Sequence, residues 1–316
     1  METVIVILGP TASGKSDVAV KLAKKLNGEI ISADSRQVYE YMDIGTNKPS
    51  KKQLSTVPHH LINIIEPTKN FTAGDFVKLA DKKINEIFNR KKIPIIVGGT
   101  GLYIKALIDG LIEIPSNKKI RTVLTDYYKK MGLPHCNKLL KNLDPETAKT
   151  IDRQNPVRVL RAIEICLLTG RKFSELKKET KKSRYNYVLF GLKLPKSNLY
   201  NCTNFRVDKM IKNGLISEAK KLVKKYSADN SVLKSTIGYK EIIDYLVGKI
   251  SKSEAIDLIK QNTRHYAKRQ MTWFKKDSRI LWLESKNNPL KKILNYLKKS
   301  DILKICGKST IGRHSF

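Results

Sequence analysis

A glycine-rich turn between an apolar run and a helical pattern constrains this chain more than any other feature. The run Val4–Leu8 predicts a buried parallel strand, and apolar residues recur every four positions from Ser16 to Asn27, which predicts a helix. The turn reads GPTASGKS and matches G-x-x-x-x-G-K-[ST] in full. Backbone N–H groups and the positive end of a helix can surround a phosphate. We expect a diphosphate or triphosphate to bind the residues of this turn: Gly9, Pro10, Thr11, Ala12, Ser13, Gly14, Lys15 and Ser16.

Two side chains of the turn have expected roles in chemistry. Lys15 brings a mobile positive charge, and the Ser16 hydroxyl is placed to be a ligand of Mg²⁺, the cofactor that we expect. Hydrolases with this turn usually have a strand that ends in an aspartate near the metal ion. Here the strand candidate Ile93–Val97 runs into Gly98-Gly99-Thr100. This favours a pyrophosphate held as a leaving group with attack at carbon, although nucleoside kinases also depart from the usual aspartate.

An aspartate follows the second strand candidate. The run Glu29–Ser32 leads to Asp34, and ligands of open parallel sheets bind beyond the carboxyl ends of the strands. We therefore expect Asp34 beside the glycine-rich turn. The residues alone leave three roles open for it: a group near the metal ion, a base for an attacking nucleophile, or a cap on local backbone N–H groups.

The order of the expected elements indicates an α/β protein. Strand candidates at 4–8, 29–32, 93–97, 187–192 and 280–283 alternate with helical patterns, which is typical of a parallel sheet. Strand signals vanish between residues 114 and 185, which we expect to be a helical insertion domain in a core made of residues 1–113 and 186–316. Ser251 and Glu254 predict a capping box at the start of a late helix, and the last ten residues predict a frayed tail.

The charge of the chain points to a polyanionic partner. The formal net charge is +33, which favours nucleic acid, although 49 of the 62 basic residues are lysines and A/T-rich codons alone inflate lysine. No apolar run approaches the roughly 18 residues of a membrane helix, and no signal peptide is expected. The four cysteines lack metal-type spacing, so we expect reduced thiols and a cytoplasmic location: Cys136, Cys166, Cys202 and Cys306.

Seven stretches that occur in order across Gly9–Phe274 carry a family resemblance. They read GPTASGKS, ADSRQVY.YMDIGTNKP, VPHHLI, VGGTGLY, NPVRVLRAIEI, GYKE and TRHYAKRQMTWF. Together they resemble the tRNA dimethylallyltransferase family, in its bacterial type because a C-terminal Cys/His zinc finger is lacking. The resemblance implies a P-loop NTPase-like α/β core with a tRNA-binding helical insertion. It also implies dimethylallyl diphosphate as donor and, as acceptor, the N6 amine of the adenosine 3′ of the anticodon in the tRNA anticodon stem-loop. Mg²⁺ assists, pyrophosphate is released, and we expect a monomer.

The resemblance also assigns roles to residues. Asp34 becomes the base that accepts the amine proton, while Thr11 and Arg206 join Lys15 at the donor. The implied tRNA contacts are Asp34, Ser35, Arg36, Gln37, Thr100, Arg121, Val157, Arg158, Val159, Leu160 and Arg161. From the residues alone, Arg206 would be read as a surface arginine of a helix.

The stretch TRHYAKRQMTWF predicts a basic helix face. Arg264, Lys268 and Arg269 are spaced to contact tRNA phosphates. Its aromatic residues can stack on unpaired bases, but we favour a core position for Trp273 and Phe274. We interpret His59 and His60 as structural rather than metal-binding.

Three other functions compete with tRNA prenylation. An adenylate dimethylallyltransferase would share the glycine-rich turn and the aspartate, but a mononucleotide needs no large basic insertion. A P-loop kinase is disfavoured by the Gly98-Gly99-Thr100 strand end, and an RNA-binding module without activity would have no use for an intact phosphate-binding turn.

Overall fold

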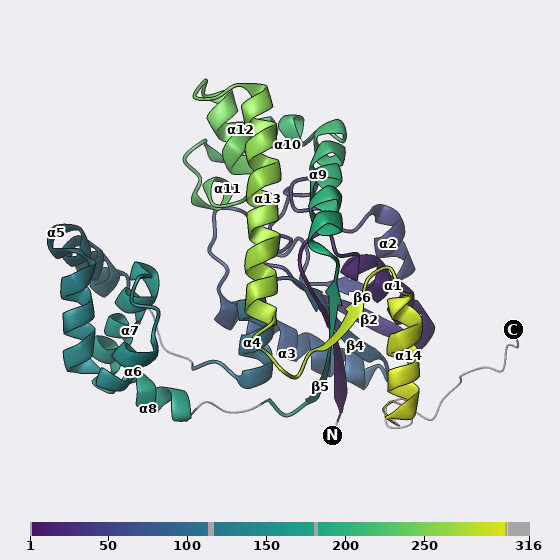
Figure 1. The fold of residues 1–316 in the computed structure, drawn as a ribbon, viewed down its shortest axis with the longest axis horizontal. Helices are drawn as coiled ribbons and strands as arrows, with labels where there is room; N and C mark the ends of the chain where they lie inside the picture. The colour runs from purple at the N-terminus through teal and green to yellow at the C-terminus, as the bar shows by residue number, and fades with distance from the viewer. Residues whose placement is uncertain (1, 113–116, 180–182, 301, 303–316) are drawn as a thin grey trace, which may run out of the picture. The chain divides into compact units, whose positions relative to one another are not determined.

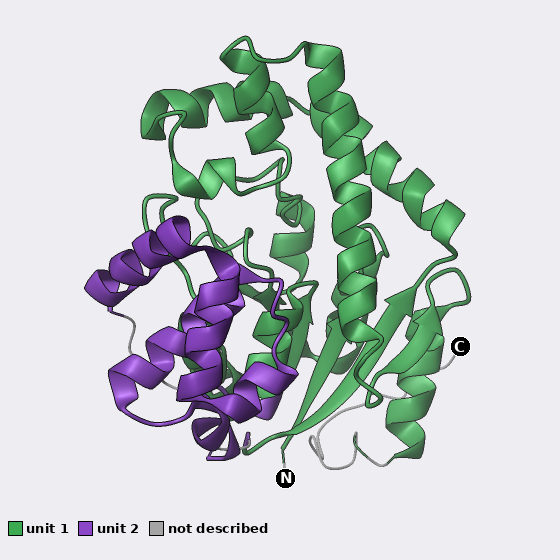
Figure 2. Ribbon diagram, turned by 60° about the vertical axis from the view of Figure 1, so that its left-hand side comes forward, with its two compact units in different colours: residues 1–108, 184–316 green, residues 109–183 purple. Residues whose placement is uncertain are grey.

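The computed structural model describes residues 2–112, 117–179, 183–300 and 302 of the chain (Figure 1). It divides into two compact units, one of residues 1–108 and 184–316 and one of residues 109–183 (Figure 2). The helical unit thus starts at Asp109 and ends at Ser183, where the sequence suggested 114–185. The expected tail at 307–316 and Cys306 lie outside the described residues. Among the described helices, none is long and apolar enough to cross a membrane.

One parallel sheet forms the centre of the larger unit, as predicted. In the described residues its strand order is β3-β2-β4-β1-β5-β6, and every pairing is parallel. Its strands are β1 (Thr3–Leu8), β2 (Gly28–Ala33), β3 (His59–His60), β4 (Ile93–Gly98), β5 (Asn186–Lys193) and β6 (Leu281–Glu284). The two weaker strand candidates are therefore confirmed as β5 and β6.

The central strand β1 shows why the sheet needs cover on both faces. All six of its residues are buried, and alternate residues join different hydrophobic clusters. Val4, Val6 and Leu8 pack with α3 (Ala73–Asn89) and α4 (Gly101–Asp109). Ile5 and Ile7 pack with α1 (Lys15–Leu26) and α14 (Pro289–Lys299). A strand buried on both faces reads as a continuous apolar run, as this one does.

Five helices form a second cluster in the same unit. They are α9 (Lys196–Lys212), α10 (Leu215–Tyr226), α11 (Ser231–Lys234), α12 (Tyr239–Leu246) and α13 (Lys252–Phe274), and α2 (Lys51–Thr56) lies elsewhere in the unit. The long helix α13 runs from the other four helices of this cluster to the sheet (Figure 1). Its predicted capping box at Ser251 and Glu254 is confirmed, and so is the core position of Phe274. The core position expected for Trp273 is wrong, because its side chain is 36% exposed and lies against Gly101.

The unit of residues 109–183 has a small hydrophobic core of its own. Its helices are α5 (Lys118–Leu143), α6 (Pro145–Thr150), α7 (Pro156–Thr169) and α8 (Phe173–Lys178), and α5 bends at Gly132, where φ is 79°. Val159 of α7 is fully buried in this core. The buried Asp144 caps α6, and its carboxylate accepts hydrogen bonds from Thr147 N at 3.0 Å and from Ser174 N at 2.8 Å.

The Asp144 carboxylate generates a prediction about this unit. Burial raises the pKa of Asp144, but hydrogen bonds from Thr147 and Ser174 outweigh it and lower the pKa to about 2. The folded unit therefore gains stability from ionised Asp144 above about pH 4 and loses it as the pH falls toward 2. We expect Asp144→Ala to destabilise the unit by about 2 kcal/mol, because buried donors lose their acceptor.

Hydrogen exchange of the amides in α5 to α7 measures this effect in the full chain. Asp126→Ala is the matched control, because the Asp126 side chain is 65% exposed and pairs only with Lys129 in the described residues. Equal amide protection in the two variants would contradict the role of Asp144.

Candidate active site

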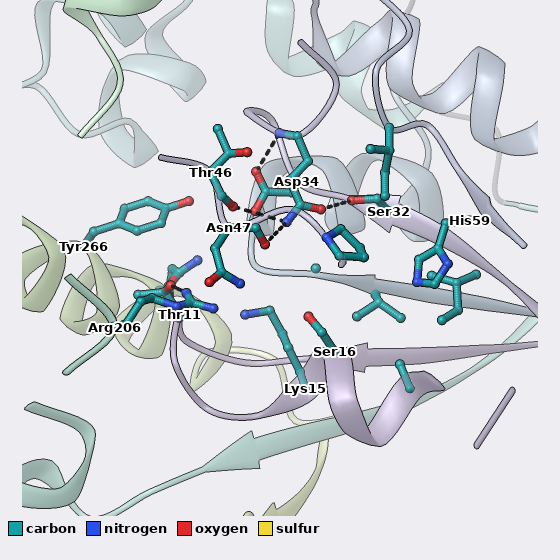
Figure 3. A pocket seen from close by; sticks show the side chains of 18 residues that line it. Thr11, Lys15, Ser16, Ser32, Asp34, Thr46, Asn47, His59, Arg206 and Tyr266 are labelled. Carbon is teal, nitrogen blue, oxygen red and sulfur yellow. Dashed lines mark hydrogen bonds between the residues drawn. The ribbon is translucent and has the colours of Figure 1, made fainter. Parts of the chain in front are cut away.

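The carboxyl ends of three neighbouring strands converge on one pocket. Gly9–Ser16, which we call the phosphate-binding loop, follows β1, Asp34 follows β2, and Gly99 and Thr100 follow β4. Figure 3 shows Lys15 and Ser16 across from Asp34, Thr46 and Asn47, with Arg206 and Tyr266 at one end and His59 at the other. Because these strands are parallel neighbours, loops far apart in the sequence meet at one edge of the sheet.

The phosphate-binding loop has the conformation that its glycines predict. Gly9 has a φ of 149°, and a Cβ there would lie 2.6 Å from the Leu192 carbonyl oxygen. Gly14 and Ala12 also have positive φ angles, of 80° and 63°. The loop is thereby folded tightly between β1 and α1, where its backbone N–H groups and the start of the helix can face an anion.

Two cationic side chains lie in this pocket. The Lys15 Nζ donates to the Pro10 carbonyl at 3.1 Å, and Arg206 of α9 donates to the Thr11 hydroxyl. Burial and, to a smaller extent, the Arg206 charge lower the pKa of Lys15 to about 8, although the Asp34 carboxylate opposes both. Burial also lowers the pKa of Arg206, whereas the negative charges of Asp34 and Asp17 raise it. Two cations held this close together, with one carboxylate, form a site that favours a multiply charged anion.

Asp34 uses one carboxylate oxygen as a local cap. Its Oδ1 accepts from Arg36 N at 2.8 Å and from Gln37 N at 3.4 Å. In the described part of the chain, Oδ2 has no hydrogen-bond partner, and Asp34 lines the pocket. The capping role, one of the three that the sequence left open for Asp34, is therefore present in the structure. It fixes the carboxylate, while the second oxygen stays available to a ligand.

Helix α13 joins the strand ends to one another. Its buried Gln270 accepts from Thr11 N at 2.7 Å and donates to the Gly99 carbonyl at 2.9 Å. One turn earlier, Tyr266 interacts with Thr100, whose hydroxyl accepts from Ser35 N at 3.0 Å. Burial raises the pKa of Tyr266 to about 12, with a contribution from Asp34, so the hydroxyl stays protonated. The helix thus connects the phosphate-binding loop with the ends of β2 and β4.

Comparison with known proteins places this geometry in a family. The family model described as IPP transferase matches residues 37–277, about three quarters of the chain. The chain belongs to the IPP transferase family. It is 43% identical to tRNA dimethylallyltransferase 1 of Syntrophotalea carbinolica over 89% of this chain and 91% of that protein. It is 45% identical to the tRNA dimethylallyltransferase of Carboxydothermus hydrogenoformans over 92% of this chain and 95% of that protein.

Solved structures of the IPP transferase family agree with the fold. A full-length tRNA isopentenylpyrophosphate transferase from Bacillus halodurans is 40% identical, with a TM-score of 0.71 and coverage of 97% of this chain and 98% of that one. A eukaryotic dimethylallyltransferase solved acting on tRNA is 28% identical, with a TM-score of 0.81 over 98% of this chain and 82% of that one. The core is therefore P-loop NTPase-like, as the sequence predicted.

The pocket contains residues that sequence reasoning missed. Tyr266, Gln270, Thr46, Asn47 and His59 all line it. Tyr266 and Gln270 lie in the stretch TRHYAKRQMTWF and are four residues apart, so they share one face of a helix. That spacing was the available signal for these two residues, because their partners are about 170 to 260 residues away in the sequence.

Several predicted tRNA contacts of the larger unit have partners inside the chain. Arg36 donates to Ser235, and Arg264 donates to Asn204 at 2.7 Å. The Gln37 side chain accepts from Ser32 and donates to the Thr46 and Asn47 carbonyls. Lys268 and Arg269 are exposed on α13. The exposed face of α13 therefore carries fewer unengaged cations than the sequence suggested.

Among the predicted tRNA contacts of residues 109–183, some side chains also have partners inside the chain and others are exposed. Arg121 and Arg161 both pair with the buried Glu164, at 3.0 Å and 2.7 Å. Val157 is 75% exposed and Arg158 is about half exposed, whereas Leu160 is half-buried. The buried side chain of Val159 packs in the core and is not available to RNA, which corrects that part of the expectation.

The lowered pKa of Lys15 generates a prediction about anion binding. At pH 9 a group with a pKa of about 8 is protonated in about one tenth of the molecules, so binding of an anion must include uptake of a proton. We expect inorganic pyrophosphate to bind about tenfold more weakly at pH 9 than at pH 7, as measured by calorimetry.

Lys15→Arg is the matched variant, because arginine stays protonated over this range. Its affinity should change less between the two pH values than that of the unaltered protein. The same pH dependence in both proteins would exclude Lys15 as its origin.

Proposed function

We propose that this chain transfers the dimethylallyl group of dimethylallyl diphosphate to the N6 amine of the adenosine 3′ of the anticodon in tRNA. Family membership supports prenyl transfer to tRNA. The observation that carries the chemistry is the pocket, in which Lys15 and Arg206 lie close to the carboxylate of Asp34. Cationic groups suit a leaving pyrophosphate, and a carboxylate suits the amine that displaces it.

The bond changes of the proposed reaction need only the two substrates and the side chains of this pocket. The N6 lone pair forms the bond to C1 of the donor, the C1–O electron pair leaves with the pyrophosphate, and the amine proton passes to Asp34. Lys15, Arg206 and the N–H groups of the phosphate-binding loop stabilise the charge that develops on the leaving oxygens. An adenine amine is a poor nucleophile because its lone pair is delocalised, so a hydrogen bond to the free oxygen of Asp34 raises its reactivity.

The rest of the pocket suits a hydrocarbon. Apolar side chains line it beside the polar groups: Ala19, Ile30, Pro49, Ile62 and Val97. We propose that they accommodate the five-carbon chain of the donor and exclude water from it.

A magnesium ion fits this site through the substrate. The exposed Ser16 hydroxyl is one available ligand, and no group of three or more His, Cys, Asp or Glu side chains in the described residues is arranged to hold a metal ion. Mg²⁺ is commonly bound by one or two protein ligands, waters and substrate phosphates. We propose that Mg²⁺ bound in this way adds positive charge to the leaving group.

We propose the anticodon stem-loop as the acceptor and the cytoplasm as the place of action. Residues 114–183 contain 17 basic and 7 acidic residues, a surplus that suits a folded RNA better than a mononucleotide. The described cysteines Cys136, Cys166 and Cys202 are unpaired thiols, as expected in a reducing compartment. We also propose that the protein acts as a monomer.

One assay tests the proposal against its runner-up, adenylate prenylation. The protein is incubated with radiolabelled dimethylallyl diphosphate and either tRNA or AMP. We expect label on tRNA alone. Label on AMP alone would establish the runner-up, and transfer of the terminal phosphate of ATP would establish a kinase.

A substitution of Asp34 separates its capping role from its role as base. Asp34→Asn keeps an oxygen for the N–H groups of Arg36 and Gln37, so the turn should stay folded. It removes the proton acceptor, so we expect kcat to fall by about two to four orders of magnitude. Pyrophosphate binding should not weaken, because the substitution removes a negative charge from the pocket that holds the anion. Single-turnover transfer of label to tRNA measures the effect. Near-normal turnover would leave Asp34 with the cap alone.

The exposed cations of α13 should make tRNA binding depend on salt. We expect the logarithm of affinity to fall linearly with the logarithm of salt concentration, because bound counterions are released. Lys268→Ala and Arg269→Ala should each reduce this slope by about one. Lys298→Ala, an exposed lysine of α14, is the matched control. An affinity that does not change with salt would mean that the surplus of lysine is compositional.

A further inference from the structure

A short loop forms the wall of the pocket that faces the phosphate-binding loop. Residues Asp43–Lys48 follow the turn of Asp34, and Thr46 and Asn47 line the pocket. In Figure 3 the Asn47 side chain points into the pocket toward Lys15 and Arg206. The loop contributes polar groups to the site proposed for the donor.

A carboxylate from a distant helix holds the start of this loop. Glu218 of α10 accepts from the backbone N–H groups of Asp43 at 3.0 Å, Ile44 at 2.9 Å and Gly45 at 3.0 Å. Three amides on one carboxylate fix both its oxygens and the direction of the loop backbone. Charge-assisted bonds of this kind are stronger than bonds between neutral groups.

A buried tyrosine completes the clamp on the loop. The Tyr239 hydroxyl donates to Glu218 Oε1 at 2.6 Å, and its side chain is fully buried. Its ring lies so close to Gly45 that a Cβ there would be 2.5 Å away, so this position requires glycine. The loop backbone is therefore gripped on one side by Glu218 and packed against Tyr239.

The far end of the loop is fixed as well. Lys48 is almost fully buried, and its Nζ donates to the Tyr39 carbonyl at 2.6 Å and to Asp43 Oδ1 at 2.8 Å. Gln37 donates to the Thr46 and Asn47 carbonyls at 3.3 and 3.2 Å. The loop is thus joined to the turn of Asp34 and is preformed before any ligand binds.

Asn47 is the residue of the loop whose side chain is left for a ligand. It has a φ of 50°, a left-handed conformation that asparagine tolerates. Its N–H donates to the Ile44 carbonyl at 3.0 Å, and its own carbonyl accepts from Gln37. In the described part of the chain, the carboxamide has no hydrogen-bond partner. The backbone is fully used, and only the side chain projects into the pocket.

We propose that the Asn47 carboxamide binds the diphosphate of the prenyl donor, and that Glu218 is the positioning residue that holds it there. The identity of the donor rests on the proposed function; the anion contact itself does not. An amide adds an N–H donor without a third positive charge beside Lys15 and Arg206. It can therefore orient the diphosphate without increasing the repulsion between the two cations.

The first test measures the contact directly. Asn47→Ala should weaken binding of inorganic pyrophosphate about tenfold in calorimetry and raise the KM for the donor by a similar factor, because a hydrogen bond to a charged group is lost. Asn47→Asp should weaken both further, because a carboxylate repels the anion. The affinity for tRNA should not change. Unaltered pyrophosphate binding in both variants would overturn the proposal.

The second test asks whether Glu218 acts through Asn47. Glu218→Gln replaces one acceptor oxygen with an N–H₂ group that faces backbone amides, so it should also raise the donor KM. In the Asn47→Ala background the same change should add little, because the group being positioned is absent. An equal loss in both backgrounds would reject the positioning role. Tyr239→Phe, which removes only the hydroxyl, is the milder variant and should show the same dependence on Asn47.

Glu241→Gln is the matched control. Glu241 is buried in the same helical cluster and accepts from Gly238 N and Asn262, and in the described residues it has no hydrogen bond to the loop. The substitution should change thermal stability, but its effect on the donor KM should be the same with and without Asn47→Ala. If the unaltered protein binds pyrophosphate in an Asn47-dependent way but transfers no prenyl group, the proposed function fails while the anion contact stands.

Discussion

The confinement of Lys15 and Arg206 in one pocket with Asp34 is the constraint on which the rest of the structure depends. Burial lowers the pKa of both cations, so each is destabilised until an anion arrives. The free site is thus short of negative charge, and Asp34 offsets only part of the deficit. The binding of a multiply charged anion would offset the remaining deficit, as the proposed function requires.

Such a site holds its geometry only if it is supported from outside. Gln270 connects the phosphate-binding loop to the turn after β4, and Tyr266 reaches the Thr100 hydroxyl from the same helix. Glu218 and Lys48 secure the opposite wall. Apart from the Lys48 contact, which is local, these contacts join side chains to partners far away in the sequence. The helices α10 and α13 therefore do more than cover the core, because they set the distance between the two walls of the pocket.

The difference between local elements and contacts made by distant residues explains what the sequence could predict. The strand β1, the phosphate-binding loop and α1 are contiguous, so local periodicity and one motif suffice for them. Asp34 was placed by the rule that ligands bind at the carboxyl ends of parallel strands. Gln270, Glu218 and Asn47 depend on which helix packs on which loop, and a single sequence does not state that. The prediction for Trp273 was wrong for a related reason. Helical periodicity indicates which face of the helix a residue lies on, but the burial of the Trp273 ring depends on its packing against Gly101.

The basic residues separate into two populations by chemistry. Arginines such as Arg36, Arg121, Arg161, Arg206 and Arg264 are engaged with partners inside the chain, where a planar guanidinium can hold two groups at once. The 49 lysines supply most of the surplus charge, and many of them lie on exposed helix faces. Net charge alone therefore overstates how many cations are free to meet RNA at fixed positions. The paired arginines therefore fix local geometry, whereas the exposed lysines supply most of the surplus positive charge.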